Sequence, residues 1–301
     1  MAGGSGFVGS AIGAELVARG HHVRAISREP GKLAWANAQV EELAGEFFRP
    51  EVAQRAARGC LIVINAAGTS GPLMREVNVG GTEALLDAAR KEGVRQFVQI
   101  SSLAAYERAG QSYIDESGPL KCEGDAYGLS KADADRRVFD AAREGLLTTV
   151  LRPGAVLGVH PTSYWSVQLL HRLVRGEVQL RGDGRESLPV VHGRDLARAV
   201  MLVVERAAAD NEVFNLADEH TTFRTLIDAY CRFLGVGTPR GIPLSKLPPG
   251  TYFNGTFAAD SIATKMSYKA SMSLADALAE SENYWRVSVQ GVDMVIPRHS
   301  R

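Results

Sequence analysis

The stretch Gly3-Gly4-Ser5-Gly6-Phe7-Val8-Gly9 stands directly before a predicted helix over Ser10–Arg19, which Gly20 ends. It fits the pattern Gly-x-x-Gly-x-x-Gly. Glycines in such a loop let the backbone approach a pyrophosphate, and the start of the next helix offers free N–H groups and the positive end of the helix dipole. Alone, the pattern fits a flexible glycine turn equally well. The rest of the chain must therefore support a dinucleotide site.

Strand and helix patterns alternate over the first half of the chain. The predicted strands are His22–Ser27, Leu61–Ala66, Gln96–Ile100 and Thr148–Arg152, and the predicted helices between them are Gly80–Glu92 and Ala126–Glu144. The run at Leu61–Ala66 is continuously apolar, which is typical of a parallel strand buried on both faces. This alternation predicts an α/β fold with a doubly wound parallel sheet of the Rossmann type.

After Pro153 the alternation stops and the elements become less regular. We therefore predict a dinucleotide-binding domain over residues 1–154, to which residues 189–217 return. Residues 155–188 and 218–301 are predicted to form a smaller substrate lobe.

Composition narrows the classes of partner. The 301 residues include 34 basic and 34 acidic side chains, so the formal net charge is zero and nothing favours nucleic acid or an anionic membrane. No run reaches the roughly 18 apolar residues of a membrane helix. The three cysteines suit neither a disulfide framework nor a zinc site. We expect a cytoplasmic protein with a small-molecule substrate and no metal, and a homodimer is left open.

Three polar features point to a reaction. Tyr127 and Lys131 are four positions apart on a predicted helix and share one face. A phenol is a poor base at neutral pH, and a nearby ammonium and a cationic nicotinamide ring favour its phenolate form. Ser101 and Ser102 follow a strand, where parallel sheets bind ligands. Asn78 precedes a helix. Taken singly, each feature also fits a surface pair, a loop cap or a helix cap.

Together these residues resemble the extended short-chain dehydrogenase/reductase family, which includes nucleotide-sugar epimerases, dehydratases and related carbonyl reductases. The likeness spans residues 3–217. Besides the glycine loop, it rests on the segments Ile100–Tyr106, Asp115–Leu120, Tyr127–Lys131, Leu151–Gly154 and Val191–Ala197.

The resemblance implies a role for each matching residue. Tyr127 would be the catalytic acid and base, Lys131 its electrostatic partner and a ribose ligand, and Ser102 the group that orients the substrate. Ser102 is preferred to Ser101 because it lies four positions before Tyr106, as is usual in the family. The remaining cofactor-binding residues would be Gly3, Gly6, Phe7, Val8 and Gly9 at the pyrophosphate, Ala66 and Ala67 along the cofactor, Asn78 in support, and Pro153 beside the nicotinamide.

The second strand of the fold bears on the choice of cofactor. An acidic residue at its end would bind the adenosine 2′-hydroxyl of NAD. None stands at 26–28, where the chain has Ile26-Ser27-Arg28. Arg28, together with Lys32, is suited to a 2′-phosphate, so we expect NADP, with NAD as the alternative. An arginine in a surface turn would also account for Arg28.

These features predict an NAD(P)-dependent oxidoreductase acting on a carbonyl or secondary alcohol, in which Tyr127 moves the proton. One alternative is a nucleotide-sugar epimerase or dehydratase that recycles a bound cofactor. The arginine with which such members bind their substrate aligns with Leu188, while Arg185 is out of register, which weakens that alternative. Another alternative is a non-catalytic dinucleotide-binding protein on the same fold.

The first strand of the fold is almost wholly missing. In this fold it precedes the glycine loop and lies in the middle of the sheet, yet only Met1 and Ala2 stand before Gly3. Each aliphatic side chain buried by such a strand contributes roughly 1.5–3 kcal/mol. We therefore expect the natural chain to start several residues upstream. The alternative is that another segment or a partner chain fills the gap.

Overall fold

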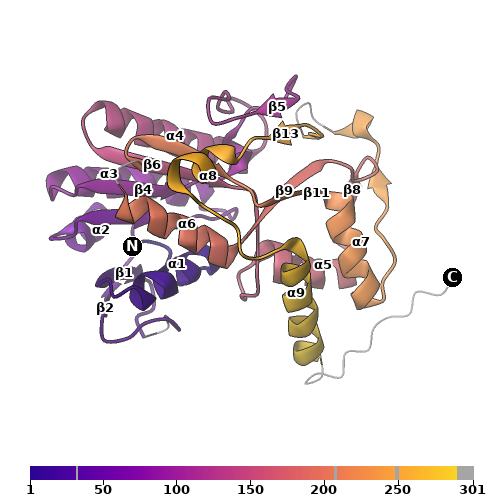
Figure 1. Ribbon diagram of the computed structural model, residues 1–301, viewed down its shortest axis with the longest axis horizontal. Coiled ribbons are helices and arrows are strands. Elements are labelled where there is room, and N and C mark those ends of the chain that lie inside the picture. Colours follow the sequence, from indigo (N-terminus) through magenta and orange to yellow (C-terminus); the bar gives the residue numbers. More distant parts are fainter. Residues whose placement is uncertain (32, 207–208, 248–250, 290–301) are drawn as a thin grey trace.

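The computed structural model describes residues 1–31, 33–206, 209–247 and 251–289. Its central element is a four-stranded parallel sheet (Figure 1). In spatial order its strands are β10 (Glu212–Leu216), β6 (Leu147–Pro153), β4 (Gln96–Ile100) and β3 (Ile62–Asn65). The predicted α/β fold with a parallel sheet is confirmed.

Helices cover both faces of this sheet. One layer consists of α1 (Phe7–Ala18) and α6 (Gly193–Glu205), and the other of α2 (Pro50–Ala57), α3 (Gly81–Lys91) and α4 (Ala126–Arg143). Successive strand residues alternate between the two cores: Ile64, Val98 and Leu151 pack with α1 and α6, whereas Val63, Phe97 and Val150 pack with the other layer. Burial on both faces explains the continuous apolar strands.

Two residues stand where the first strand of the fold was expected. β1 (Val23–Ser27) pairs with β2 (Val40–Ala44) in a separate sheet, and Met1 and Ala2 lie between β1 and β3. The Ala2 N–H donates to the Ile64 carbonyl at 3.0 Å, and the Ile26 N–H donates to the Met1 carbonyl at 3.0 Å. The Met1 α-amino group donates to the Arg24 carbonyl at 2.6 Å, and burial lowers its pKa to about 6.

A second lobe follows β6. Its three-stranded sheet has the order β11 (Glu219–Thr222), β9 (Ser187–His192) and β7 (Ala155–Leu157). The helices of this lobe are α5 (Leu169–Val174), α7 (Phe223–Leu234) and α9 (Leu274–Val289). Within residues 189–217, α6 and β10 pack with the large parallel sheet, whereas β9 belongs to the small sheet.

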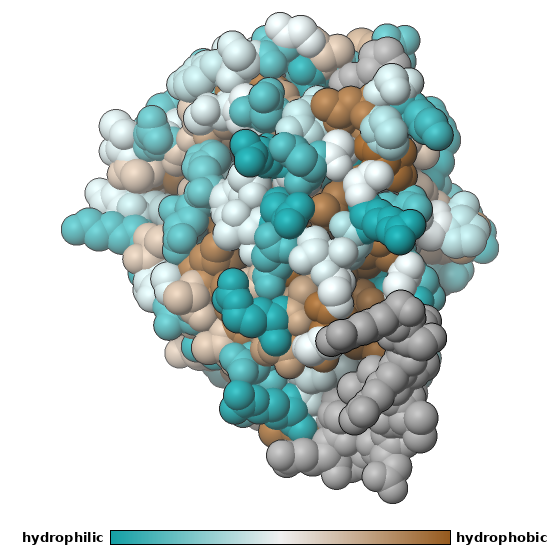
Figure 2. Space-filling model, turned by 90° about the vertical axis from the view of Figure 1, so that its right-hand side faces the viewer, coloured by the Kyte–Doolittle hydropathy of each residue, from teal (hydrophilic) through white to brown (hydrophobic). Residues whose placement is uncertain are grey.

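Short elements complete the chain. They are η1 (Glu76–Gly80), η2 (Leu103–Ala105), β5 (Tyr113–Ile114), η3 (Tyr164–Gln168), β8 (Leu180–Arg181), β12 (Gly241–Ile242), η5 (Leu244–Lys246), β13 (Thr256–Phe257) and α8 (Asp260–Met266). On the face of the molecule shown in Figure 2, hydrophilic and hydrophobic residues are interspersed. In the part of the chain that the structure describes, no helix has the length and apolar character needed to cross a membrane.

Candidate active site

The start of α4 packs directly on η2, the turn that follows β4. A Cβ atom added to Gly128 would lie 2.5 Å from the Ala104 carbonyl oxygen, so only glycine allows this approach. Asp125 caps α4 by accepting the Gly128 N–H at 2.7 Å, and Ser102 caps η2 by accepting the Ala104 N–H at 3.1 Å. The contact brings the turn of helix that carries Tyr127 to the turn that carries Ser102.

The two serines after β4 have different surroundings. Ser101 is only 4% exposed, and its hydroxyl lacks a hydrogen-bond partner among the described residues. Ser102 is half-buried, as is Tyr127. Of the two hydroxyls, that of Ser102 is therefore the one a substrate can reach.

Lys131 is held at the end of β4. Its side chain is 5% exposed, and its ammonium donates to the Ile100 carbonyl at 3.1 Å. An ammonium has three donors, and within the described residues this is the one hydrogen bond that Lys131 makes. Gly68 approaches it closely, because a Cβ there would lie 3.2 Å from Nζ. The remaining donors are available to a ligand beside Gly68.

Asn78 connects the loop after β3 to α4. Its amide nitrogen donates to the Ser130 hydroxyl at 2.8 Å and to the Thr69 carbonyl at 2.9 Å, and its amide oxygen accepts the Thr69 N–H at 2.9 Å. All three contacts hold the Gly68 loop against the helix that carries Lys131. That Asn78 supports the site stays a prediction.

The glycine loop lies against the segment that follows β3. Gly3 has a φ of +84°, in the left-handed region, and a Cβ there would lie 2.6 Å from backbone atoms of Ala66 and Ala67. A Cβ on Gly9 would overlap the Gly3 carbonyl, and the Gly6 N–H donates to that same carbonyl at 3.0 Å. The loop therefore packs so closely on itself and on Ala66 and Ala67 that Gly3 and Gly9 leave no room for a side chain.

The start of α1 faces a hollow between the two lobes. Within the described chain, α1 has no side-chain cap. The Phe7 N–H donates to the Thr162 hydroxyl at 3.0 Å, while Val8 packs into the core beneath. The hollow has a volume of about 210 Å³ and is bordered by Phe7, Gly158, His192 and other residues.

The other predicted cofactor residues lie where their strands end. Arg28 is exposed directly after β1 and forms no ion pair with a described residue, and Lys32 lies outside the described residues. Pro153 is the buried last residue of β6. Because carboxyl ends of parallel strands meet at one edge, Arg28, Ala66, Ser102 and Pro153 all belong to that edge.

Comparison with known proteins supplies the family. Residues 1–217 match the model of the NAD dependent epimerase/dehydratase family. The chain belongs to this family. The match covers the glycine loop, the serine turn and the Tyr127–Lys131 helix, and it ends shortly after β10.

Curated relatives in the family are mainly reductases and dehydrogenases. A Stigmatella aurantiaca 4-hydroxy-2-methyl-3-oxo-4-farnesyl-3,4-dihydroquinoline-1-oxide ketoreductase is 28% identical over 75% of this chain and 71% of its own. A Mycobacterium tuberculosis 3 beta-hydroxysteroid dehydrogenase/Delta 5-->4-isomerase is 31% identical, over 66% and 59%. A Stenotrophomonas maltophilia 2-alkyl-3-oxoalkanoate reductase is 27% identical, over 80% and 76%. The chain is an enzyme of this family.

Solved structures show the same fold. The dTDP-glucose 4,6-dehydratase DesIV from Streptomyces venezuelae, with NAD and TYD bound, has a TM-score of 0.82 at 24% identity, covering 97% of this chain and 98% of its own. MoeE5 in complex with UDP-glucose and NAD has a TM-score of 0.80, also at 24% identity, over 96% and 98%.

Two residues bear on the expectation for a nucleotide-sugar enzyme, Leu188 and Arg185. Leu188 is buried in the core of the second lobe, at 8% exposure. Arg185 is exposed and pairs with Asp183 at 3.1 Å. Neither residue supplies a buried guanidinium at the position where we expected one in a nucleotide-sugar enzyme.

One further contact at the glycine loop was not predicted from the sequence. The indole N–H of Trp35 donates to the Gly4 carbonyl at 2.8 Å. A Cβ on Gly13 would lie 2.5 Å from the indole ring, so the ring of Trp35 packs directly against the backbone of α1. A glycine inside a predicted helix is the signal that could have revealed a close neighbour.

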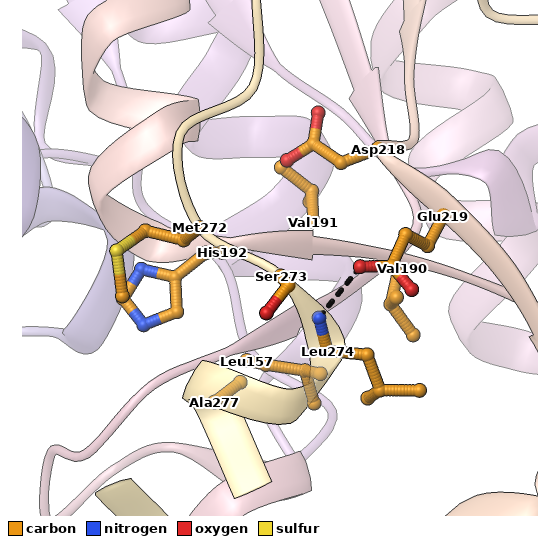
Figure 3. A pocket seen from close by; sticks show the side chains of 10 residues that line it. All are labelled: Leu157, Val190, Val191, His192, Asp218, Glu219, Met272, Ser273, Leu274 and Ala277. Atoms are coloured by element: carbon orange, nitrogen blue, oxygen red, sulfur yellow. Dashed lines mark hydrogen bonds between the residues drawn. The ribbon is translucent and has the colours of Figure 1, made fainter. Parts of the chain in front are cut away.

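A second cavity is too small for a substrate. It has a volume of about 10 Å³ and lies between β9, β11 and the start of α9, where the Leu274 N–H donates to Glu219 at 2.7 Å (Figure 3). This is room for about one water molecule. Burial raises the pKa of the neighbouring Asp218 carboxyl to about 6, although Asp218 accepts the Tyr268 hydroxyl at 2.7 Å. Among the described residues, no group of His, Cys, Asp or Glu is arranged to hold a metal ion.

Proposed function

We propose that this enzyme is an NADP-dependent reductase that interconverts a carbonyl group and a secondary alcohol on a small molecule. The observation that carries the proposal is the shared position of Ser102, Tyr127 and Lys131. The close contact at Gly128 and the Lys131–Ile100 hydrogen bond bring all three to the end of β4. A purely non-catalytic binding protein has no need of this combination.

The chain offers a matching site for the dinucleotide. The glycine loop at the start of α1 suits the pyrophosphate, and the free donors of the Lys131 ammonium suit a ribose. A phosphate at the Phe7 amide would take the place of the Thr162 hydroxyl. Arg28 at the end of β1 is suited to the 2′-phosphate of NADP, which is why we propose NADP and not NAD.

Each catalytic side chain has one task. The Ser102 hydroxyl orients the substrate carbonyl, and Tyr127 donates a proton to the oxygen as the carbon is reduced. Lys131 places a positive charge one helical turn from Tyr127, on the same face of α4. When bound, the nicotinamide supplies the hydride. In the reverse direction Tyr127 takes the proton from the alcohol.

Two observations favour a reductase. Neither the buried Leu188 nor the exposed Arg185, which pairs with Asp183, provides the arginine that we expect to bind a nucleotide sugar. Two of the relatives are named as a ketoreductase and a 2-alkyl-3-oxoalkanoate reductase, both of which act on ketones by their names.

The test is net turnover of nicotinamide. The purified protein is mixed with NADPH or NADH and a panel of ketones, and the loss of nicotinamide absorbance is followed. Oxidation of NADPH that depends on a ketone supports the proposal. A tightly held dinucleotide without net redox change would indicate an epimerase or dehydratase instead, and failure to bind any dinucleotide would contradict both.

A further inference from the structure

Arg108, just past η2, carries a guanidinium that the protein does not neutralise. Its Nε is buried and has no hydrogen-bond partner among the described residues. Its Nη2 makes one long contact, at 3.4 Å, to the Leu103 carbonyl. The guanidinium lies 5.4 Å from the centre of the Phe257 ring. The nearby Glu107 carboxylate accepts the backbone N–H of Arg108 at 2.8 Å and makes no ion pair with its side chain.

Arg152 shows how this protein neutralises a buried arginine. It is 1% exposed, pairs with the equally buried Asp135 at 2.9 Å, and lies 4.5 Å from the centre of the Tyr106 ring. Burying a charge is costly unless a partner compensates it. Arg108 lacks such a partner within the described residues, and burial accordingly lowers the pKa of its guanidinium.

The two carboxylates whose charges act most strongly on Arg108 already have direct partners. Asp125 accepts the Lys121 ammonium at 2.5 Å, and Glu186 accepts the Arg181 guanidinium at 2.9 Å. Both carboxylates act on Arg108 at longer range only. In this group of charges Arg108 is therefore the one cation without a contact partner among the described residues. An anion from outside the chain would neutralise its charge.

Arg108 also lies beside the proposed catalytic residues. The Leu103 carbonyl that Arg108 contacts directly follows Ser102. Asp125, whose charge acts on the Arg108 guanidinium, caps α4 two positions before Tyr127. The Arg108 residue as a whole is only partly buried, so a ligand from solvent can reach it. A guanidinium in this place can hold one end of a molecule whose other end is at Tyr127.

We propose that Arg108 binds an anionic group of the substrate, a carboxylate or a phosphate. The planar guanidinium binds both in the same two-pronged way. The proposal rests on the function proposed above and narrows its substrates from ketones in general to ketones that carry an acid group. Binding of the acid at Arg108 positions the carbonyl at Ser102 and Tyr127.

Binding of three matched alcohols tests the proposal without turnover. The ligands are 3-hydroxyoctanoate, its neutral methyl ester and 3-hydroxyoctyl phosphate, each titrated calorimetrically into protein holding reduced dinucleotide, where no reaction can occur. The proteins are the wild type, Arg108→Gln, Arg108→Lys and, as a control, Arg143→Gln on the exposed end of α4. The two anions distinguish a carboxylate from a phosphate.

We expect at least one anion to bind the wild type about ten-fold or more tightly than the ester, as a charge-assisted contact allows. Arg108→Gln should lose that advantage and bind the ester as the wild type does, Arg108→Lys should keep part of it, and Arg143→Gln should match the wild type. Arg108→Gln should also unfold at no lower temperature, because no carboxylate loses a directly contacting counter-charge.

Two results would overturn the anion site. One is a wild type that binds neither anion more tightly than the ester, and the other is unchanged anion binding in Arg108→Gln. If the enzyme reduces neutral ketones and the rate does not depend on Arg108, the proposed reductase function is supported and the anion site is contradicted. If anions bind through Arg108 but 3-oxooctanoate and other oxo acids are not reduced, the anion site is supported and the proposed reductase function is contradicted.

Discussion

Single side chains carry the proposed chemistry, and their effect depends on how firmly they are held. The Lys131 ammonium is buried and hydrogen-bonded to Ile100, so its charge stays in one place near Tyr127. Electrostatic interactions are stronger in such surroundings than in water. The Lys131 ammonium is therefore a fixed charge, which a flexible surface lysine would not be.

Tyr127→Phe removes the transferable proton with little change in volume. Turnover should fall by roughly 10²–10⁴-fold, the usual contribution of a positioned acid or base. Dinucleotide affinity should stay within a few-fold, because the phenol is not needed to hold the cofactor. Steady-state rates and a fluorescence titration measure the two effects, with Tyr113→Phe, an exposed tyrosine, as control. Near-normal turnover would contradict the role of Tyr127.

Arg28→Ala should act on the choice between cofactors. NADP carries a phosphate that NAD lacks, and a charge-assisted contact contributes roughly 1.5–3 kcal/mol. The ratio of kcat/KM with NADPH to that with NADH should fall about ten-fold or more. An equal loss with both cofactors would show that Arg28 does not contact the 2′-phosphate.

At the scale of elements, close helix packing brings the proposed catalytic residues together. α4 approaches η2 only because Gly128 lacks a side chain, and Tyr127 is the next residue along the helix. The Asn78 contacts hold the loop after β3 against the same helix. The register between these elements therefore matters as much as the identity of the reactive side chains.

Gly128→Ala tests this register. The added methyl group would lie 2.5 Å from the Ala104 oxygen, so α4 must shift, at a cost of about 1–3 kcal/mol in the free energy of unfolding. Turnover should fall further than dinucleotide affinity. In the control Gly80→Ala the new Cβ meets no atom within 4 Å, and alanine favours a helix by up to about 1 kcal/mol. Similar behaviour of the two variants in urea unfolding and turnover would argue against the close contact.

The turn between β10 and β11 should make stability depend on pH. Asp218 has a pKa of about 6 in the folded protein, above its usual 3.8, because it is buried. The folded state then holds a proton that the unfolded state releases, so stability from this group is complete below about pH 4 and is lost as the pH rises through 6. Relative to Asp218→Asn, the wild type should lose unfolding free energy between about pH 4 and pH 7. If the unfolding free energies of the wild type and Asp218→Asn change with pH in parallel, the raised pKa of Asp218 is contradicted.

On the scale of the whole molecule, a buried polar network joins the sheet to the second half of the chain. Arg152 on β6 pairs with Asp135 on α4 and contacts the Tyr106 ring. The Tyr106 hydroxyl donates to Asn215 on β10 at 2.7 Å, and the Asn215 amide donates to the Ala258 carbonyl at 2.8 Å. The network therefore runs from α4 through the sheet to the segment after β13.

Asp135→Asn should destabilise the whole fold. It leaves the Arg152 charge buried without compensation, which typically costs 3–5 kcal/mol. Asp140→Asn on the same helix breaks an exposed pair with Arg143 and should cost less than about 1 kcal/mol. Equilibrium unfolding measures both, and equal effects would mean that the buried pair contributes no more than a surface pair.

The sequence alone determined the fold class and the candidate residues that lie close together along the chain. The glycine loop and the Tyr127–Lys131 pair depend on neighbours within a few residues. β4 was predicted with its observed bounds, and β3 was predicted because a doubly buried strand has a distinctive apolar run.

The tertiary structure decided the features whose partners lie far away in the sequence. β2 was not predicted, because its half-exposed residues lack a continuous apolar run. Trp35 finds the Gly4 carbonyl 31 positions away, and Arg108 meets Phe257 from the other end of the chain. Periodicity and spacing report on local backbone geometry, whereas a missing counter-charge becomes visible only when packing has brought distant side chains together and removed them from water.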